Sequence, residues 1–421
     1  LENEFVQNFN ILWPRNEKDT AFIINVEKNN NSELEKLLPA NLLALGRPAF
    51  NERQPFFFCT QDEQKVWYIF IKELSIQRGK YVLLVELFSW NNLSLPTKNG
   101  SSQFKLLPTS AQTSRILFAM TRITNPKFID LLLGQKPIKE IYFDNRLKFS
   151  SDKLNRSQKT AVEHVLNNSI TILQGPPGTG KTSTIEEIII QVIERFHAFP
   201  ILCVAASNIA IDNIAEKIME NRPQIKILRI LSKKKEQQYS DDHPLGEICL
   251  HNIVYKNLSP DMQVVANKTR SGEMISKSED TKFYKEKNRV TNKVVSQSQI
   301  IFTTNIAAGG RELKVIKECP VVIMDEATQS SEASTLVPLS LPGIRNFVFV
   351  GDEKQLSSFS NIPQLETSLF ERVLSNGTYK NPLMLDTQYR MHPKISEFPI
   401  KKIYNGELKD GVTDEQKAWP G

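Results

Sequence analysis

The chain has 421 residues, of which 53 are basic and 47 are acidic, and its hydrophobic fraction is 40%. This length allows two or three domains, and the mild basic excess permits a polyanionic partner without demanding one. No apolar run approaches the ~18 residues that indicate a membrane span, so we expect no membrane partner, while four scattered cysteines without a C-x-x-C pair favour a reducing compartment.

The first part of the chain, residues 1–107, predicts a β-rich domain. The opening LENEFVQNFN lacks the basic flank and apolar centre of a signal peptide, so nothing in it argues for secretion. Short aromatic and β-branched runs follow, such as TAFIINVEK, QPFFFCT and GKYVLLVELFSW, separated by Asn, Gly, Asp and Gln clusters. Evenly spaced strands of this kind are typical of a small barrel or sandwich, and no function follows from them alone.

Residues 108–150 change to a helical period. Ile116, Met120 and Ile123 recur at the spacing of one helix face. Asn125-Pro126 then interrupts or kinks the pattern, because the residue before a proline avoids helical geometry. We expect a helix here that packs on a core.

From residue 151 onward, apolar strands alternate with helices. The strands are ITILQ, PILCVAAS, QIIFTTN, PVVIMDEA and NFVFVGD, and helical patterns such as KTSTIEEIIIQVIERF lie between them. Strands that are apolar throughout, with helices between them, indicate an α/β fold with a parallel sheet. Residues 233–299 are polar and charged, and we interpret them as a helical insertion, with disorder as the alternative.

A phosphate-binding loop follows the strand ITILQ. The segment GPPGTGKT matches G-x-x-x-x-G-K-[ST] at every fixed position and stands between a strand and a helix. Its glycines let backbone N–H groups surround a phosphate, and the helix adds the positive end of its dipole. The expected loop residues are Gly175, Pro176, Pro177, Gly178, Thr179, Gly180, Lys181 and Thr182.

The segment VVIMDEATQ supplies the acidic half of this site. Its apolar residues place Asp325 and Glu326 at the carboxyl end of a buried strand, where ligands of open α/β sheets bind. We expect Asp325 and the Thr182 hydroxyl to hold Mg²⁺, and Glu326 to orient or deprotonate the attacking water. No N-K-x-D motif for guanine is present, since NKTR lacks the carboxylate, so the expected nucleotide is ATP.

Further segments stand in a fixed order around these two motifs. They are LNRSQKTAV, AASNIAIDNI, FTTNIAAGG, DEATQSSEAS, GDEKQL and DTQYRMHP. Over about residues 150–400 this set closely resembles the superfamily 1 helicases of the up-frameshift, nonsense-mediated-decay type, a group that includes senataxin and the immunoglobulin-mu-binding helicase. The resemblance implies an α/β, RecA-like parallel sheet of the P-loop NTPase class, with an N-terminal β-barrel domain, a stalk helix and a helical insertion.

The resemblance also implies roles for individual side chains. Gln158 would read the adenine edge, and Gln355 would sense the γ-phosphate. Tyr389 would stack on adenine, and Arg390 would reach the γ-phosphate to stabilise transition-state charge. The expected catalytic residues are Lys181, Asp325, Glu326, Gln355 and Arg390.

The resemblance further implies nucleic-acid contacts at Ser207, Asn208, Thr303 and Thr304, which follow or end two strands. Small hydroxyl and amide side chains suit phosphate and sugar contacts that carry no sequence information. Taken alone, Ser207-Asn208 is an ordinary helix cap.

The resemblance implies six parts along the chain. They are a β-barrel accessory domain over 1–107, a stalk helix and linker over 108–150, RecA-like domain 1 over 151–232 and 300–383, the insertion over 233–299, and the start of a second RecA-like domain over 384–421. No ALTRA-like late motif is present. We therefore expect a fragment that lacks most of the second RecA-like domain and is weak or inactive on its own.

The leading hypothesis is an ATP-dependent helicase or translocase, expected from the family to move 5′ to 3′ on single-stranded RNA or DNA. One alternative is a nucleic-acid-stimulated ATPase switch that remodels RNA–protein complexes with little unwinding, and another is an inactive clamp. The intact catalytic set counts against the clamp. We expect a cytoplasmic protein, with a nuclear role left open, and translation-termination or decay factors as partners through segments outside this chain.

Overall fold

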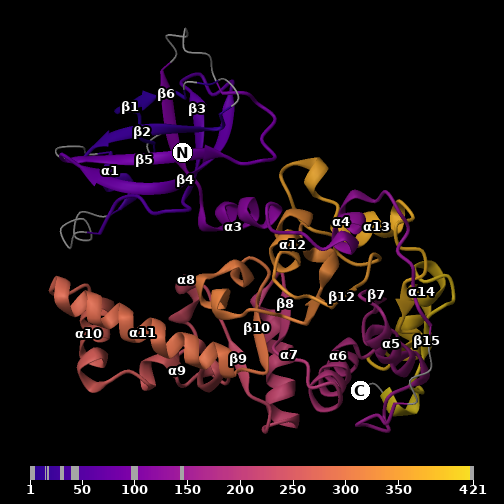
Figure 1. Ribbon diagram of the computed structural model, residues 1–421. Coiled ribbons are helices and arrows are strands. Elements are labelled where there is room, and N and C mark those ends of the chain that lie inside the picture. Colours follow the sequence, from indigo (N-terminus) through magenta and orange to yellow (C-terminus); the bar gives the residue numbers. More distant parts are fainter. Residues whose placement is uncertain are drawn as a thin grey trace. The chain divides into compact units, whose positions relative to one another are not determined.

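The structure is a computed structural model that describes residues 5–417 apart from 15, 17–18, 29–32, 39–46, 96–102 and 143–146. The chain forms two compact units. One combines Leu1–Thr121 with Lys268–Thr281, and the other combines Arg122–Asn267 with Lys282–Gly421. Figure 1 shows the antiparallel sheet of the first unit and the parallel sheet of the second.

The first unit is built on an antiparallel sheet in the order β1-β2-β5-β4-β3-β6. The strands are β1 (Phe9–Leu12), β2 (Ala21–Glu27), β3 (Pro55–Thr60), β4 (Val66–Gln77), β5 (Lys80–Leu87) and β6 (Phe104–Pro108), with the short helix α1 (Leu34–Leu37) after β2. Alternate residues of β2 and β5 are buried, which gives the sheet one apolar face. Arg78 and Gly79 both have positive φ and make the tight turn from β4 to β5.

The two outer strands of this sheet are linked through the chain that precedes β1. Val6 forms an antiparallel bridge with Leu106 of β6, and both backbone hydrogen bonds of that bridge are present. Helix α3 (Ala111–Met120) follows β6 and is capped by the Ser110 hydroxyl. Its Phe118 ring packs edge-on against Phe70 and Phe88, so α3 covers part of the sheet.

The second unit contains a fully parallel sheet in the order β13-β7-β12-β11-β8-β10-β9. Its strands are β7 (Ile170–Gln174), β8 (Ile201–Ala205), β9 (Ile227–Arg229), β10 (Ile300–Thr304), β11 (Val321–Asp325), β12 (Asn346–Gly351) and β13 (Leu383–Met384). Every residue of β7, β8 and β11 is buried, as expected for strands covered on both faces. The predicted α/β fold with a parallel sheet is confirmed.

Helices connect these strands and cover the sheet. They are α4 (Pro126–Leu133), α5 (Arg156–Asn167), α6 (Lys181–Ile190), α7 (Asn208–Asn221), α12 (Glu332–Leu339), α13 (Leu369–Ser375) and α14 (Pro393–Lys402). Asn125 caps α4 and Pro126 is its first residue, so the predicted interruption separates α3 from α4. A two-stranded pairing of β14 (Thr387–Gln388) with β15 (Lys409–Asp410) follows β13.

Residues 233–299 are largely helical. The helices are α8 (Lys233–Glu236), α9 (Leu250–Lys256), α10 (Pro260–Ser271) and α11 (Lys277–Gln297), with a 3₁₀ turn at Gly246–Ile248. Leu245 and Cys249 are fully buried in the core of the parallel sheet and anchor this segment to it.

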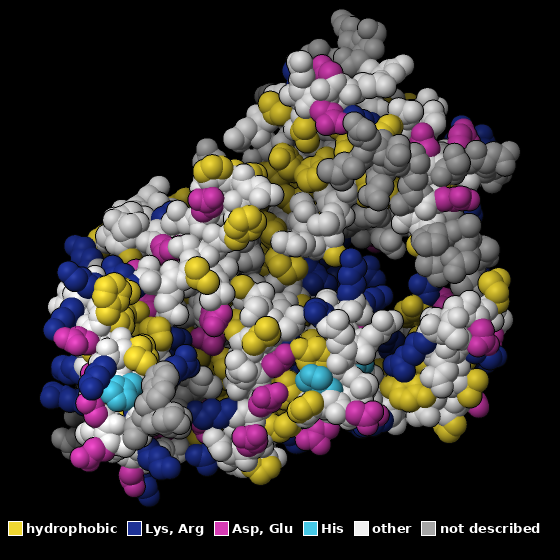
Figure 2. Space-filling model, turned by 180° about the vertical axis from the view of Figure 1, so that it is seen from behind, with side chains coloured by type: hydrophobic (Ala, Val, Ile, Leu, Met, Phe, Trp, Pro, Cys, Tyr) yellow, Lys and Arg dark blue, Asp and Glu magenta, His cyan; other side chains and the backbone are white. Residues whose placement is uncertain are grey.

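Charged side chains of both signs are mixed over the face drawn in Figure 2, in keeping with a net charge of only +6. Within the part of the chain that the structure describes, no helix is both long enough and apolar enough to cross a membrane.

Candidate nucleotide-binding and nucleic-acid site

The phosphate loop runs from the end of β7 to the start of α6. Gly178 and Gly180 have φ of 77° and 79°, a left-handed backbone that glycine adopts without strain. The Gly175 N–H donates to the Gly351 carbonyl at 2.8 Å and ties the loop to β12. The Thr179 hydroxyl donates to the Pro176 carbonyl at 2.8 Å, which closes the loop on itself.

Lys181 begins α6 and folds back over the loop. Its Nζ donates to the Gly175 carbonyl at 2.6 Å. Burial lowers the pKa of its ammonium group, while the nearby carboxylates Asp325, Asp352 and Glu326 act in the opposite direction. Among the described residues, the only hydrogen-bond partner of this cation is a carbonyl, and a phosphate oxygen can replace that partner at low cost.

Asp325 ends β11, and Glu326 follows it with a left-handed φ of 47°. Asp325 is only 7% exposed, and its Oδ1 has no hydrogen-bond partner in the described part of the chain. Burial raises the pKa of Asp325 to about 6, although Lys181 opposes that shift. An orphaned carboxylate oxygen beside the phosphate loop is what a divalent cation would satisfy.

The donor set also fits magnesium. Among the residues that the structure describes, no group of three or more His, Cys, Asp or Glu side chains could hold a metal ion. Magnesium in phosphate sites commonly uses one or two protein oxygens together with water and substrate phosphates. Asp325 and the Thr182 hydroxyl, in the first turn of α6, suit that coordination.

A hydrogen-bonded cluster lies at the end of β12. Asp352 is 2% exposed, and its Oδ2 accepts from Gln355 Nε2 at 2.7 Å and from the Tyr404 hydroxyl at 2.6 Å. The predicted Gln355 is thus oriented by a buried carboxylate. Asp352 and Tyr404 were missed in the sequence, although Asp352 stands in the quoted segment GDEKQL.

Tyr389 and Arg390 lie directly against the phosphate loop, although they are about 200 residues away in sequence. The Tyr389 N–H donates to the Gly178 carbonyl at 2.8 Å. A Cβ added to Gly178 would lie 2.5 Å from the Cβ of Arg390, so these two segments of the chain are in contact. The Tyr389 ring is 38% exposed, and its hydroxyl accepts from Asn155 Nδ2 at 3.0 Å.

Gln158 is placed beside the loop, but its amide is already engaged. Its Nε2 donates to the Thr179 carbonyl at 3.0 Å, and its Oε1 accepts from the Asn155 N–H at 2.9 Å. With Asn155 it forms the capping box of α5. In this arrangement Gln158 supports the loop, and each end of its amide keeps one further donor or acceptor position.

Ser207 and Asn208 both make structural bonds. The Ser207 hydroxyl caps α7 by accepting from the Ala210 N–H at 3.2 Å. The Asn208 Oδ1 accepts from Arg229 Nη2 at 2.7 Å. The ordinary capping role is therefore present, and a nucleic-acid contact would use what these side chains leave free.

The structure speaks against a contact through the Thr303 hydroxyl. Thr303 is fully buried, and its hydroxyl donates to the Ile230 carbonyl at 3.0 Å. Thr304, the last residue of β10, is the one partly exposed position of that strand. Thr303 lies within the buried part of the strand, and its side chain points to the opposite face from that of Thr304. Only the Thr304 side chain, at the end of the strand, is partly exposed.

Arg229 was missed by sequence reasoning and organises both of these loops. It is fully buried, and its guanidinium donates to Asp212 Oδ1 at 2.8 Å and to the Ile230 carbonyl at 3.1 Å, in addition to Asn208. Tyr239 donates to the other oxygen of Asp212. An arginine inside the apolar run ILRIL was the available signal, because a buried charge must be paired.

Comparison with known proteins gives matches along nearly the whole chain. Residues 153–287 and 256–360 match a family model described as an AAA domain, and residues 365–420 match a second model of the same description. Residues 1–110 match the ECM32 domain.

Three curated relatives illustrate the likeness. The ATP-dependent helicase NAM7 of Saccharomyces cerevisiae is 34% identical over 64% of this chain and 27% of its own length. The regulator of nonsense transcripts 1 homolog of Drosophila melanogaster is 34% identical over 63% and 23%. The DNA polymerase alpha-associated DNA helicase A of Saccharomyces cerevisiae is 28% identical over 81% and 53%.

The chain spans about a quarter of the length of the first two of these relatives. Among solved structures, the arterivirus nonstructural protein 10 helicase is 12% identical, with a TM-score of 0.35 over 85% of this chain and 55% of that one, a likeness too slight to carry an argument.

Proposed function

The chain belongs to the superfamily 1 helicases of the up-frameshift type, and from this we propose that it binds and hydrolyses ATP to drive movement along single-stranded RNA or DNA. One observation carries the proposal more than any other. Tyr389 and Arg390 pack on Gly178, so a base-stacking ring and a cation are brought to the same loop that holds Lys181.

The proposed chemistry assigns one task to each charged group. Lys181 exchanges its bond to the Gly175 carbonyl for phosphate oxygens. Glu326, next to the buried Asp325, orients the attacking water, and Arg390 stabilises the charge that develops on the transferred phosphoryl group. Magnesium, held by Asp325 and Thr182, neutralises phosphate charge when it is bound.

Gln355 is proposed to report the γ-phosphate. Its amide is held by Asp352, which also accepts from Tyr404 in the segment after α14. A change at the phosphate would therefore reach the chain that follows Arg390 through two hydrogen bonds. Gln158 is proposed to orient the loop and, when ATP is bound, to contact adenine.

Nucleic acid is proposed to lie along the loops after β8 and β10. Ser207, Asn208 and Thr304 stand at the carboxyl ends of two neighbouring strands. Such contacts go to phosphate and sugar, so binding should be insensitive to sequence and sensitive to salt. The Thr303 hydroxyl has no part in it, because it is bonded inside.

The remaining assignments are proposals about the parts of the chain. Residues 1–107 form a β-barrel, an idea supported by the Val6–Leu106 bridge between the outer edges of the sheet. Residues 108–150 form the stalk and linker, 233–299 the insertion, and 384–421 the start of a second RecA-like domain. We further propose a cytoplasmic role with translation-termination or decay factors as partners.

A single substitution tests the assignment of the catalytic base. Glu326→Gln keeps the size and hydrogen bonding of the side chain but removes its charge and basicity. In the full-length protein we expect ATP turnover to fall by about 10²–10⁴-fold, the usual value of a general base, with ATP affinity within about threefold of wild type. Steady-state turnover and ATP binding are measured on the same preparations. Unchanged turnover would remove Glu326 from this role.

A further inference from the structure

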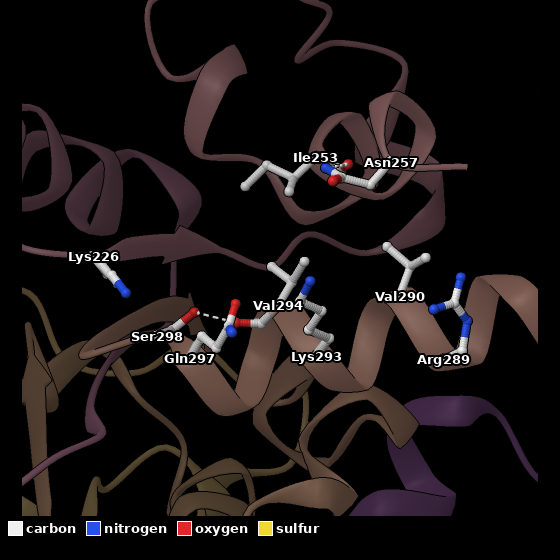
Figure 3. Close-up of a pocket in the computed structure, with 9 residues that line it drawn as sticks. All are labelled: Lys226, Ile253, Asn257, Arg289, Val290, Lys293, Val294, Gln297 and Ser298. Atoms are coloured by element: carbon white, nitrogen blue, oxygen red, sulfur yellow. Dashed lines mark hydrogen bonds between the residues drawn. The ribbon is translucent and has the colours of Figure 1, made fainter. Parts of the chain in front are cut away.

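A cavity of about 390 Å³ lies beside the parallel sheet, between α9, α11 and the residue that precedes β9. Figure 3 shows side chains from both helices facing the space between them, with Lys226 at one end. All of its lining residues belong to the second compact unit. The volume falls in the range of pockets that bind small organic ligands.

The cavity is lined by three cations and no carboxylate. The cations are Lys226, Arg289 and Lys293, and none of them forms an ion pair within the described residues. The nearest acid along α11 is Glu286, whose two oxygens accept from the Ser259 N–H and hydroxyl at 2.6 and 3.0 Å. Those oxygens are turned to Ser259, and the cavity lining itself carries only positive side chains.

Some other cations of the same segment are paired. Lys256 of α9 lies 2.8 Å from Asp241, and Arg229 of β9 lies 2.8 Å from Asp212. Lys282 and Lys285 of α11 form no ion pair among the described residues either, so what distinguishes the cavity is that three cations line one hollow.

Besides its cations, the cavity is lined by aliphatic side chains and by two amides. Ile253, Val290 and Val294 supply an aliphatic surface. The Asn257 Nδ2 donates to the Ile253 carbonyl at 2.8 Å, which leaves its Oδ1 free, and the Gln297 amide has no hydrogen-bond partner among the residues described. A flat heterocycle would bury its face on the aliphatic floor and pair its polar edge with these amides.

The cavity is separate from the phosphate loop. Lys226 precedes β9 and Ser298 precedes β10, so the cavity lies at the amino ends of these strands. The phosphate loop, Asp325 and Thr304 lie at carboxyl ends. Because the strands are parallel, a strand of five residues puts about 16 Å between the two edges.

We propose that this cavity is a second binding site for a nucleoside phosphate. Its base lies on Ile253, Val290 and Val294, and its phosphates are held by Arg289 and Lys293, with Lys226 closing the other end. The ligand touches α11 just before it leads into β10. The site is independent of ATP turnover at the phosphate loop.

The test is a calorimetric titration with ADP, without Mg²⁺, on the Lys181→Ala chain, whose phosphate loop has lost its main cation. We expect one binding event to remain. Adding Arg289→Gln and Lys293→Gln should weaken that event about tenfold or more, because two charge-assisted contacts are lost.

The matched control adds Lys282→Gln and Lys285→Gln instead. Both lysines are exposed on the same helix, outside the cavity, and the net charge changes equally. The control should bind ADP like its parent, and thermal unfolding should show that every variant is folded.

Three outcomes would overturn the proposal. The Lys181→Ala chain binds no ADP, the Arg289/Lys293 variant binds ADP as its parent does, or the control loses as much affinity as the cavity variant. If the first outcome is found and the Arg289/Lys293 variant also binds a single-stranded oligonucleotide more weakly than the control does, the cavity belongs to the nucleic-acid path instead.

Discussion

The phosphate loop and the loops after β8 and β10 lie at the same edge of one sheet, but their side chains are used differently. Around the phosphate loop, and counting only residues that the structure describes, Lys181 is bonded to a carbonyl alone and Asp325 Oδ1 has no hydrogen-bond partner. In the other two loops, Asn208 is bonded to buried Arg229 and Thr303 to a carbonyl. Charged groups left without a partner point to a ligand, whereas small polar groups often satisfy the fold itself.

The largest expected effect comes from removing the metal ligand. Asp325→Asn keeps the shape of the side chain but removes the negative charge beside the phosphate loop. We expect ATP turnover to fall by about 10³-fold or more, since charge neutralisation on the phosphates is lost. Chelation of divalent cations with EDTA should abolish turnover of the wild type as well. Turnover by Asp325→Asn at more than a tenth of the wild-type rate would contradict the assignment.

The contact between Gly178 and Arg390 can be broken by one methyl group. Gly178→Ala adds a Cβ that would lie 2.5 Å from the Cβ of Arg390, in a backbone with φ of 77°. We expect turnover to fall by about tenfold to a hundredfold, because small misplacements of a catalytic group have costs of that size, together with a loss of about 1 kcal/mol in stability.

Gly377→Ala is the matched control for this substitution. Gly377 has φ of 76°, but a Cβ there meets nothing within 4 Å. It should lose no more stability than Gly178→Ala, because only the backbone strain is shared, and should leave turnover within about twofold. Equal turnover in the two variants would show that the Arg390 contact does not matter.

The two threonines of β10 sharpen the comparison further. Thr303→Val should lower the free energy of unfolding by about 1 kcal/mol, because a buried hydrogen bond is removed, and should leave nucleic-acid affinity unchanged. Thr304→Val should leave the free energy of unfolding nearly unchanged and lower the affinity for nucleic acid severalfold. Urea unfolding and fluorescence anisotropy with a labelled oligonucleotide measure the two effects, and the opposite pattern would restore Thr303 as the contact.

The smallest expected effect is on stability at low pH. His164 of α5 is 4% exposed, and its burial lowers the pKa of the imidazole, although Glu140 opposes that shift. The unfolded chain therefore binds a proton more readily, so stability is complete above the ordinary histidine pKa and is lost as pH falls. His164→Gln should flatten the change in urea midpoint between pH 7.5 and 5.5, and an unchanged slope would exclude His164 as its source.

The sequence was sufficient for the parallel sheet and the phosphate loop, because both have strong local signals. Apolar runs such as VVIMD are strands covered on both faces, and Gly178 and Gly180 of GPPGTGKT stand where φ is positive. The position of Asp325 followed from the strand that it ends.

Partners distant in sequence could not be predicted in the same way. Arg229 pairs with Asp212 on α7, and Tyr404 donates to Asp352, contacts that only the folded sheet creates. The amide of Gln158 was expected to be free for adenine but bonds to Thr179. Residue type identifies a capable side chain, whereas the tertiary fold decides whether it is already engaged.

The most direct test of the account is ATP turnover of the full-length protein with and without single-stranded RNA or DNA, measured at low and at moderate salt. The account predicts that nucleic acid raises turnover by tenfold or more, and that the stimulation falls as salt rises, since the contacts are mainly to phosphate. The same turnover with and without either nucleic acid would contradict it, because the loops after β8 and β10 would then have no link to the nucleotide site.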